Sequence, residues 1–213
     1  ILAPTKARPV PRDVLSGDFP TADQMALSAR LAAAIGYDFK RGRIDPTVHP
    51  FEISFTREDV RITTRFKANH IAQSIFGTLH EAGHGLYEQN IDPSFTRSIF
   101  ATDLLGLYAV GGTSYGAHES QSRLFKNHVG RSAPLWRHRY PDLIAAFPAF
   151  ASVPLGEFLA AITRVSPGLI RTDADEVTYD FHVMMRVEIE AALLDGSLAA
   201  RDLPVVWGEG VRA

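Results

Sequence analysis

Two histidines four residues apart, His80 and His84, enclose a glutamate in the HExxH sequence His-Glu-Ala-Gly-His. Residues four apart stack on one face of an α-helix, so both imidazoles can reach one metal ion. Glu81 follows His80 and points about 100° further round the helix, towards a water held by that ion. A divalent cation lowers the pKa of such a water towards about 7, and a carboxylate can then take its proton. The motif therefore predicts a metal centre with Glu81 as general base.

A catalytic zinc centre needs a third protein ligand and an open fourth position. A histidine six residues after His84 would complete one common pattern, but Asn90 occupies that place. Glu119, early in another predicted helix, is the leading candidate, and Asp103 is the second. The other interpretation of Glu119 is a solvated glutamate that the positive end of its helix dipole stabilises.

Apolar residues at helical spacing over 68–87 predict the helix that carries the two histidines. Gly77, Gly83 and Gly85 lie within it, and each costs the helix about 1 kcal/mol relative to alanine. We therefore expect another element, or a substrate, to approach this helix closely. The alternative, two ordinary histidines on a helix surface, does not explain these glycines.

The remaining pattern is mostly helical. Further helices are predicted over 21–35, 115–129, 133–147, 155–165 and 173–194. A possible capping box over 21–24 begins the first of them. Alternating apolar residues on either side of 56–59 predict a β-hairpin just before the metal helix. The expected fold class is mainly α, with a small β-hairpin or sheet beside the HExxH helix.

Composition limits the other functional classes. The 213 residues are 46% hydrophobic, which is enough to bury the core of one domain or slightly more. The net charge is −2 and no block of basic residues occurs, so neither a nucleic-acid partner nor a basic surface is expected. No apolar run approaches the roughly 20 residues that span a membrane.

Cysteine is absent from the chain. Its absence excludes disulfides, thiolate ligands and a cysteine nucleophile, and it fits a cytoplasmic protein. Any metal must then be held by histidine and carboxylate, which points to zinc or a similar divalent ion.

A polar stripe follows one face of the predicted helix over 173–194. Its members, three or four residues apart, are Tyr179, His182, Arg186 and Glu190. Such a stripe between apolar flanks faces either a buried cleft or a salt-bridged surface. Arg61, on the predicted hairpin, either serves a ligand or pairs with a nearby acid.

Five segments in this order resemble the motifs of the thermostable (Taq-type) metallocarboxypeptidases. They are His49-Pro50-Phe51, the DxRxT element Asp59–Thr63, the HExxH element His80–His84, the HESQ element His118–Gln121 and the long segment Ile170–Glu190. The similarity runs from about residue 17 to residue 207. It implies a helical metallopeptidase core, a saddle-like fold with a deep groove, and a homodimer.

The resemblance also implies a metal site. The ion would be zinc, with cobalt or another divalent ion able to substitute, and its ligands would be His80, His84 and Glu119. Glu81 would be the general base. The substrates would be peptides with a free C-terminus, and the enzyme would release their last residue through a metal-bound water that Glu81 activates.

Substrate binding is implied at a second set of residues. An arginine would hold the terminal carboxylate of the peptide in a bidentate pair, with Arg171 the first choice and Arg61 the second. Tyr179 and His182 would donate hydrogen bonds to the oxyanion of the tetrahedral intermediate.

The chain departs from the family pattern in length. Its link between His84 and Glu119 is longer than usual, with the extra residues near 98–110, and the family's GxxQDxHW motif is absent because the chain ends at Ala213. We therefore expect a single catalytic-core domain over 1–213 that is part of a longer carboxypeptidase. The alternatives are a zinc endopeptidase or aminopeptidase, and an inactive truncated remnant that binds metal.

Overall fold

The computed structural model describes residues 13–96, 98, 115–166, 168–171 and 174–212, with side chains up to residue 210. The chain divides into two compact units, Ile1–Ile162 and Thr163–Ala213. The single domain over 1–213 that the sequence suggests stays a prediction.

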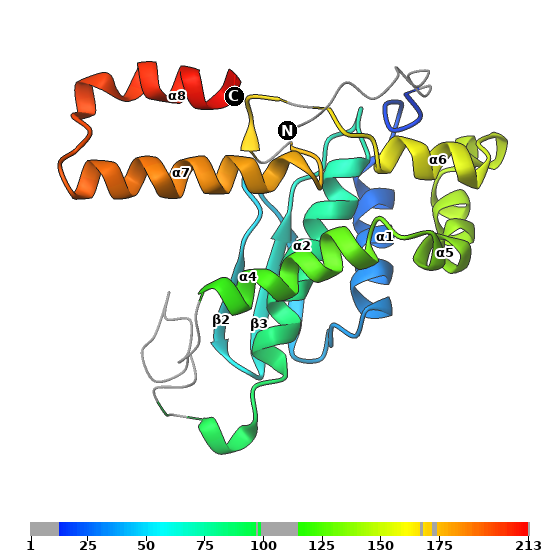
Figure 1. The fold of residues 1–213 in the computed structure, drawn as a ribbon. Helices are drawn as coiled ribbons and strands as arrows, with labels where there is room; N and C mark the ends of the chain where they lie inside the picture. Colours follow the sequence, from blue (N-terminus) through cyan, green and yellow to red (C-terminus); the bar gives the residue numbers. More distant parts are fainter. Residues whose placement is uncertain (1–12, 97, 99–114, 167, 172–173, 213) are drawn as a thin grey trace. The chain divides into compact units, whose positions relative to one another are not determined.

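The first unit combines helices with a small sheet (Figure 1). Its helices are α1 (Thr21–Ala34), α2 (Ala72–Gln89), α4 (Tyr115–Arg123), α5 (Ala133–Ala146) and α6 (Leu155–Ile162), with the π-helical segment η2 (Leu124–Val129) and the 3-10 turns η1 (Pro93–Phe95) and η3 (Pro148–Ser152). Its strands are β1 (Gly42–Pro46), β2 (Glu52–Thr56) and β3 (Asp59–Thr64). Helix α2 is central, because it contacts α1, α4, η2, β2 and β3. The mainly helical fold class with a small sheet beside the HExxH helix is confirmed.

The sheet has the strand order β1-β3-β2. Strands β2 and β3 form the predicted antiparallel hairpin, in which Ser54 pairs with Val60. Strand β1 was not predicted, because its sequence Gly-Arg-Ile-Asp-Pro has a single apolar side chain. It pairs in parallel with β3, where Ile44 lies opposite Ile62. Neighbouring strands therefore supply the order that the sequence of β1 does not indicate.

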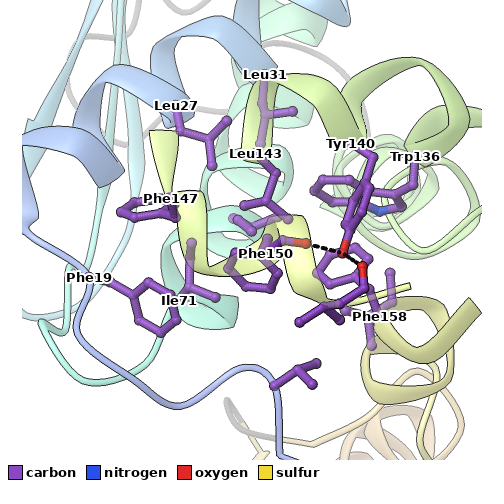
Figure 2. Close-up of a cluster of buried hydrophobic side chains, with 14 of the residues drawn as sticks. Phe19, Leu27, Leu31, Ile71, Trp136, Tyr140, Leu143, Phe147, Phe150 and Phe158 are labelled. Carbon is purple, nitrogen blue, oxygen red and sulfur yellow. Dashed lines mark hydrogen bonds between the residues drawn. The ribbon is translucent and has the colours of Figure 1, made fainter. Parts of the chain in front are cut away.

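The main hydrophobic core lies where α1, α2, α5, η3 and α6 meet (Figure 2). Its largest fully buried side chains are Trp136, Phe150, Phe158, Leu27, Leu31, Ile71, Ile75, Leu79, Leu143 and Ile162. Tyr140 also packs there, and its hydroxyl donates a hydrogen bond to the carbonyl oxygen of Val153 at 2.7 Å. A polar group in an apolar core must find such a partner, since an unpaired one costs about 1–3 kcal/mol. This core anchors one side of α2, and the opposite side carries the histidines and meets the sheet.

Helix α1 begins at Thr21 and ends before Gly36, as predicted, but it lacks the predicted cap. Its C-cap is Ile35, and Gly36 follows at φ +107°, a conformation that glycine adopts without strain. The capping box is wrong: Pro20 is the N-cap and no side chain caps the helix. Gln24 is buried instead. Its amide nitrogen donates to the carbonyl oxygens of Phe19 and Lys67, and its oxygen accepts a hydrogen bond from Ser74 on α2.

The second unit is a pair of helices, α7 (Thr178–Leu194) and α8 (Leu203–Arg212), with a 3-10 turn η5 (Ala200–Asp202) between them. Helix α7 begins later than predicted, because Asp175 accepts hydrogen bonds from the backbone of residues 177 and 178 at its start. The guanidinium of Arg186 lies 4.6 Å from the ring centroid of Trp207, which ties the two helices together. Among the described residues, no helix is long and apolar enough to cross a bilayer.

Candidate metal centre

The two histidines of the HExxH sequence lie one turn apart on α2 and face each other. Their Nε2 atoms are 3.2 Å apart, and each side chain is 16% exposed. Their rings meet edge to face, with an angle of 85° between the planes. Both Nε2 lone pairs therefore point to one spot at the surface of α2.

Glu119 on α4 brings a carboxylate to the same spot. Its Oε2 atom lies 3.2 Å from Nε2 of His84 and 3.7 Å from Nε2 of His80. These three residues form the one group of potential metal ligands found among the described residues. Asp103, the second candidate for the third ligand, lies outside the described residues.

The spacing of these atoms matches a tetrahedral ion. Zinc bonds of about 2.0–2.1 Å at a tetrahedral angle place neighbouring ligand atoms about 3.3–3.4 Å apart. The observed separations of 3.2, 3.2 and 3.7 Å lie close to this value. Catalytic zinc sites commonly use two imidazoles and one carboxylate as protein ligands and leave a fourth position open to water. The three side chains found here are of these types and are partly exposed. The residues present therefore fit a divalent metal.

A glycine on α2 allows α4 to come this close. A Cβ atom at Gly83 would lie 2.6 Å from Cα of Ser122, so any larger residue would push the α4 backbone away. The amide nitrogen of Gln121 donates to the carbonyl oxygen of Gly83 at 3.3 Å. At Gly85, a Cβ would similarly meet the ring of Tyr37 at 2.7 Å. The expectation that these glycines serve close approach is confirmed.

Burial and neighbouring groups set the charge states of two candidate ligands, His80 and Glu119. Desolvation lowers the pKa of His80 to about 3, so the ring is neutral and keeps the lone pair that binds a metal. Burial raises the pKa of Glu119, but the hydrogen bond from His84 and the nearby His80 outweigh it and hold that pKa below its usual value. The free site therefore presents a neutral imidazole beside a carboxylate, the forms that a cation requires.

Glu81 is buried beside the candidate ligands. Burial raises its pKa to about 8, with further contributions from the negative charges of Glu52 and Glu119. Lys126, on η2, is the nearby cation that acts in the opposite direction. Burial in turn lowers the pKa of Lys126 to about 8. A divalent cation at the ligand atoms would favour the ionised form of the Glu81 carboxyl.

Strand β2 turns its polar face inward. Glu52 and Ser54 lie opposite the buried Ile62 and Val60 of β3, so they share the sheet face that packs on α2. Phe55, on the other face, is 41% exposed. Burial raises the pKa of Glu52 to about 7, and the charge of Glu88 adds to this. Alternation predicts a strand but does not say which face is buried, so Glu52 was missed.

Arg61, the second choice for carboxylate binding, lies on the outer face of the sheet. It pairs with Ile53 of β2 and Arg43 of β1, away from α2. Its guanidinium makes two hydrogen bonds to Asp59, at 2.8 and 2.7 Å. The pairing of Arg61 with a nearby acid is therefore the interpretation that the structure supports.

Arg171, Tyr179 and His182 all belong to the second unit. Nη1 of Arg171 donates to the hydroxyl of Tyr179 at 2.5 Å, and its guanidinium lies over the same ring. His182 is buried, and its Nε2 lies 2.9 Å from the carbonyl oxygen of Gly168. The structure brings the arginine and the tyrosine together, whereas their role in substrate binding stays a prediction.

A helix that carries HExxH, joined by a carboxylate from a second helix, defines the metallopeptidase class. The model of one family, described as "Carboxypeptidase Taq (M32) metallopeptidase", matches residues 1–213. The chain belongs to this family.

Named relatives agree with the family model. The chain is 42% identical over 199 residues to thermostable carboxypeptidase 1 of Thermus thermophilus, which covers 93% of this chain and 37% of the relative. It is 41% identical over 192 residues to carboxypeptidase 1 of Bacillus subtilis, covering 90% and 36%. The crystal structure of an M32 carboxypeptidase from Deinococcus radiodurans R1 matches 95% of this chain and 39% of its own, with a TM-score of 0.84 and 45% identity. The chain thus spans well under half the length of these relatives.

Proposed function

We propose that this chain is the catalytic core of a metal-dependent carboxypeptidase that releases the last residue of peptides with a free C-terminus. The observation that carries this proposal is the convergence of His80, His84 and Glu119 on one point, in a chain that belongs to a family of carboxypeptidases. Zinc is the proposed ion, and cobalt or another divalent ion would substitute. A site of two imidazoles and one carboxylate favours such borderline metals over calcium or magnesium.

Glu81 has the central catalytic role in this proposal. A divalent cation held by the three ligands would lower the pKa of a water and polarise the carbonyl of the peptide bond. Glu81, one residue after a ligand and buried beside it, would take the proton from the attacking water and deliver it to the departing amine. Its position in a largely water-free environment supports this role, because bulk water competes little for the proton.

Recognition of the substrate would depend on the second unit. Arg171 remains the first choice for the terminal carboxylate, since its guanidinium contacts the neutral side chain of Tyr179, whereas the guanidinium of Arg61 is engaged by the carboxylate of Asp59. Tyr179 and His182 would donate hydrogen bonds to the oxyanion. Homodimer formation, a cytoplasmic location and the absence of nucleic-acid and membrane partners stay predictions of the sequence.

Two peptides that differ only at the C-terminus test the proposal. The metal-loaded chain is incubated with a short N-blocked peptide that ends in a free carboxylate, and with the same peptide as its C-terminal amide. We expect release of the last residue from the acid and none from the amide. A chelator should stop this release, and zinc or cobalt should restore it.

The other outcomes identify the alternatives. Internal cleavage of the amide would indicate an endopeptidase, and cleavage that requires a free N-terminus would indicate an aminopeptidase. A chain that binds zinc but cleaves none of these peptides would contradict the proposal and favour a metal-binding remnant.

A further inference from the structure

A line of three side chains leads from the candidate metal centre into the protein. Nδ1 of His84 lies 2.5 Å from Nδ1 of His118, and Nε2 of His118 lies 2.9 Å from Oε1 of Glu88. The last two side chains are almost fully buried, at 6% and 2% exposure. Glu88 follows His84 by one turn of α2, and His118 directly precedes Glu119 on α4.

The geometry of the two imidazoles is that of a hydrogen bond in the ring plane. The rings of His84 and His118 are 25° from parallel, and their centroids are 4.7 Å apart. That separation is about the distance between the two Nδ1 atoms plus one ring radius on each side. The rings therefore lie edge to edge in nearly one plane instead of being stacked face to face.

Metal binding leaves one arrangement of protons along this line. A neutral imidazole carries one proton, so His84 must carry it on Nδ1 if Nε2 is to bind a cation. His84 then donates to Nδ1 of His118, and the proton of His118 must lie on Nε2, facing the carboxylate of Glu88. The reverse tautomer of His118 would place two N–H groups against each other.

We infer that His118 and Glu88 are positioning residues for the ligand His84. The inference rests on the proposed metal site, and it assigns to the HESQ histidine a role distinct from that of the neighbouring Glu119. Hydrogen bonds of this kind fix the tautomer and orientation of a metal-binding histidine and increase its basicity. His80 differs, because its Nδ1 is buried and has no hydrogen-bond partner within the described residues. Of the two proposed histidine ligands, His84 is thus the one whose Nδ1 is fixed by a hydrogen bond.

One consequence concerns how the site is assembled. Helix α4 supplies a proposed ligand, Glu119, and the support of another, His118, from adjacent positions. Correct docking of α4 on α2 would therefore complete the ligand set and select the tautomer of His84 in a single step.

Substitution of His118 by residues that do or do not keep its hydrogen bonds tests the inference. His118→Phe retains a planar ring but can neither accept from His84 nor donate to Glu88. We expect the affinity for zinc, measured by competition with a chromophoric chelator, to fall about 10–100-fold. In His118→Gln, the amide oxygen can accept and the amide nitrogen can donate, so most of this loss should be recovered. His138→Phe, at an exposed position of α5, is the matched control and should leave the affinity unchanged.

The spectrum of the cobalt-loaded chain and the melting temperature of the metal-free chain separate positioning from packing. Positioning predicts an altered cobalt spectrum in His118→Phe and a nearly parental one in His118→Gln. Parental zinc affinity in His118→Phe would overturn the inference. The inference would also be overturned if both variants lost equal zinc affinity together with equal decreases in melting temperature.

Nitrogen NMR of the parent chain provides a test that needs no variant to fold. In the zinc-loaded protein, His84 should be protonated at Nδ1 and His118 at Nε2, and the opposite tautomer of His118 would overturn the inference. A parent that binds zinc without cleaving peptides would contradict the proposed activity and leave this inference standing. A parent that binds no zinc would overturn both.

Discussion

At the scale of single residues, burial sets the properties of the ionisable groups around α2. Glu52, Glu81 and Glu88 are largely withdrawn from water, and burial raises the pKa of the first two to about 7 and about 8. The raised pKa values of Glu52 and Glu81 mean that ionising either carboxyl costs free energy in the metal-free fold. A dication held at the proposed site would offset this cost. These residues therefore connect stability to metal binding.

Glu81 and Glu119 are expected to behave differently on substitution. Glu81→Gln should abolish peptide hydrolysis, with at least about a 1,000-fold loss, and keep the parental zinc content, because the amide cannot accept the proton. Glu119→Ala should lower zinc affinity at least about tenfold, because it removes one of three proposed ligands. Metal analysis and the free-acid peptide assay measure both effects. Loss of zinc in Glu81→Gln would mean that Glu81 is a ligand instead of a base.

Glu52 predicts a pH-dependent stability. Its pKa in the folded chain is about 7 against 4.5 in the unfolded chain, so the protonated form stabilises the fold and this contribution is lost as the pH rises through about 7. Near pH 4.5, the free energy of unfolding of Glu52→Gln should therefore match that of the metal-free parent. At pH 8, it should exceed that of the parent by about 2–3 kcal/mol. Urea unfolding at both pH values measures the difference. The exposed Glu58→Gln is the control, and an equal effect there would contradict the burial of Glu52 as the cause.

At the scale of elements, the contact between α2 and α4 decides whether the site forms. Helix α2 is held from one side by the core around Leu79 and from the other by the sheet, whose Ile62 approaches Gly85. Helix α4 brings the proposed ligand Glu119 to the site by packing directly on the backbone of Gly83. The π-helical segment that follows α4 ends at Gly130, where a Cβ would meet Leu79 at 2.7 Å. Small residues thus allow backbones to meet where the ligands must converge.

Gly83→Ala tests this contact. Alanine should favour an isolated helix by about 1 kcal/mol, but here its Cβ would lie 2.6 Å from the α4 backbone. We expect α4 to shift, with a loss of about 1–3 kcal/mol of stability and at least about a tenfold loss of zinc affinity. Gly156→Ala on α6, where no atom lies within 4 Å of the new Cβ, should be neutral or stabilising. Unchanged zinc affinity in Gly83→Ala would show that Glu119 does not depend on this approach.

At the scale of the whole molecule, the proposed functional residues are distributed over two units. The first unit contains the three proposed ligands and Glu81, and the second contains Arg171, Tyr179 and His182. The proposed activity would need both sets, because a cation alone does not select the end of a peptide. Binding of the metal should therefore stabilise the first unit, and binding of the substrate should involve the second.

Hydrogen exchange can separate these parts. Zinc at 100 times its Kd stabilises a protein that binds it by about 2.7 kcal/mol. We expect zinc to slow the exchange of backbone amides in α2 and α4 of the first unit and to change that in α7 and α8 little. Mass spectrometry with and without zinc measures the exchange. Equal protection of α7 would contradict this expectation and support the single domain over 1–213 that the sequence suggests.

Sequence alone determined the features that depend on local spacing. Helical periodicity located α1, α2 and α5 closely, alternation located the hairpin, and four-residue spacing placed His80 and His84 on one face of α2. The single helix predicted over 115–129 did not distinguish α4 from the π-helical segment that follows it. These features follow from the backbone geometry of neighbouring residues, which the order of side chains reveals.

Only the tertiary structure decided which distant groups meet. It showed that Glu52 faces inward, that Arg61 is engaged by Asp59, and that His118 joins His84 to Glu88. Each of these contacts depends on the packing of one element against another, where burial and backbone approach in three dimensions override the pattern along the chain. The motif specified the two candidate ligands on α2, and packing supplied the environment around them.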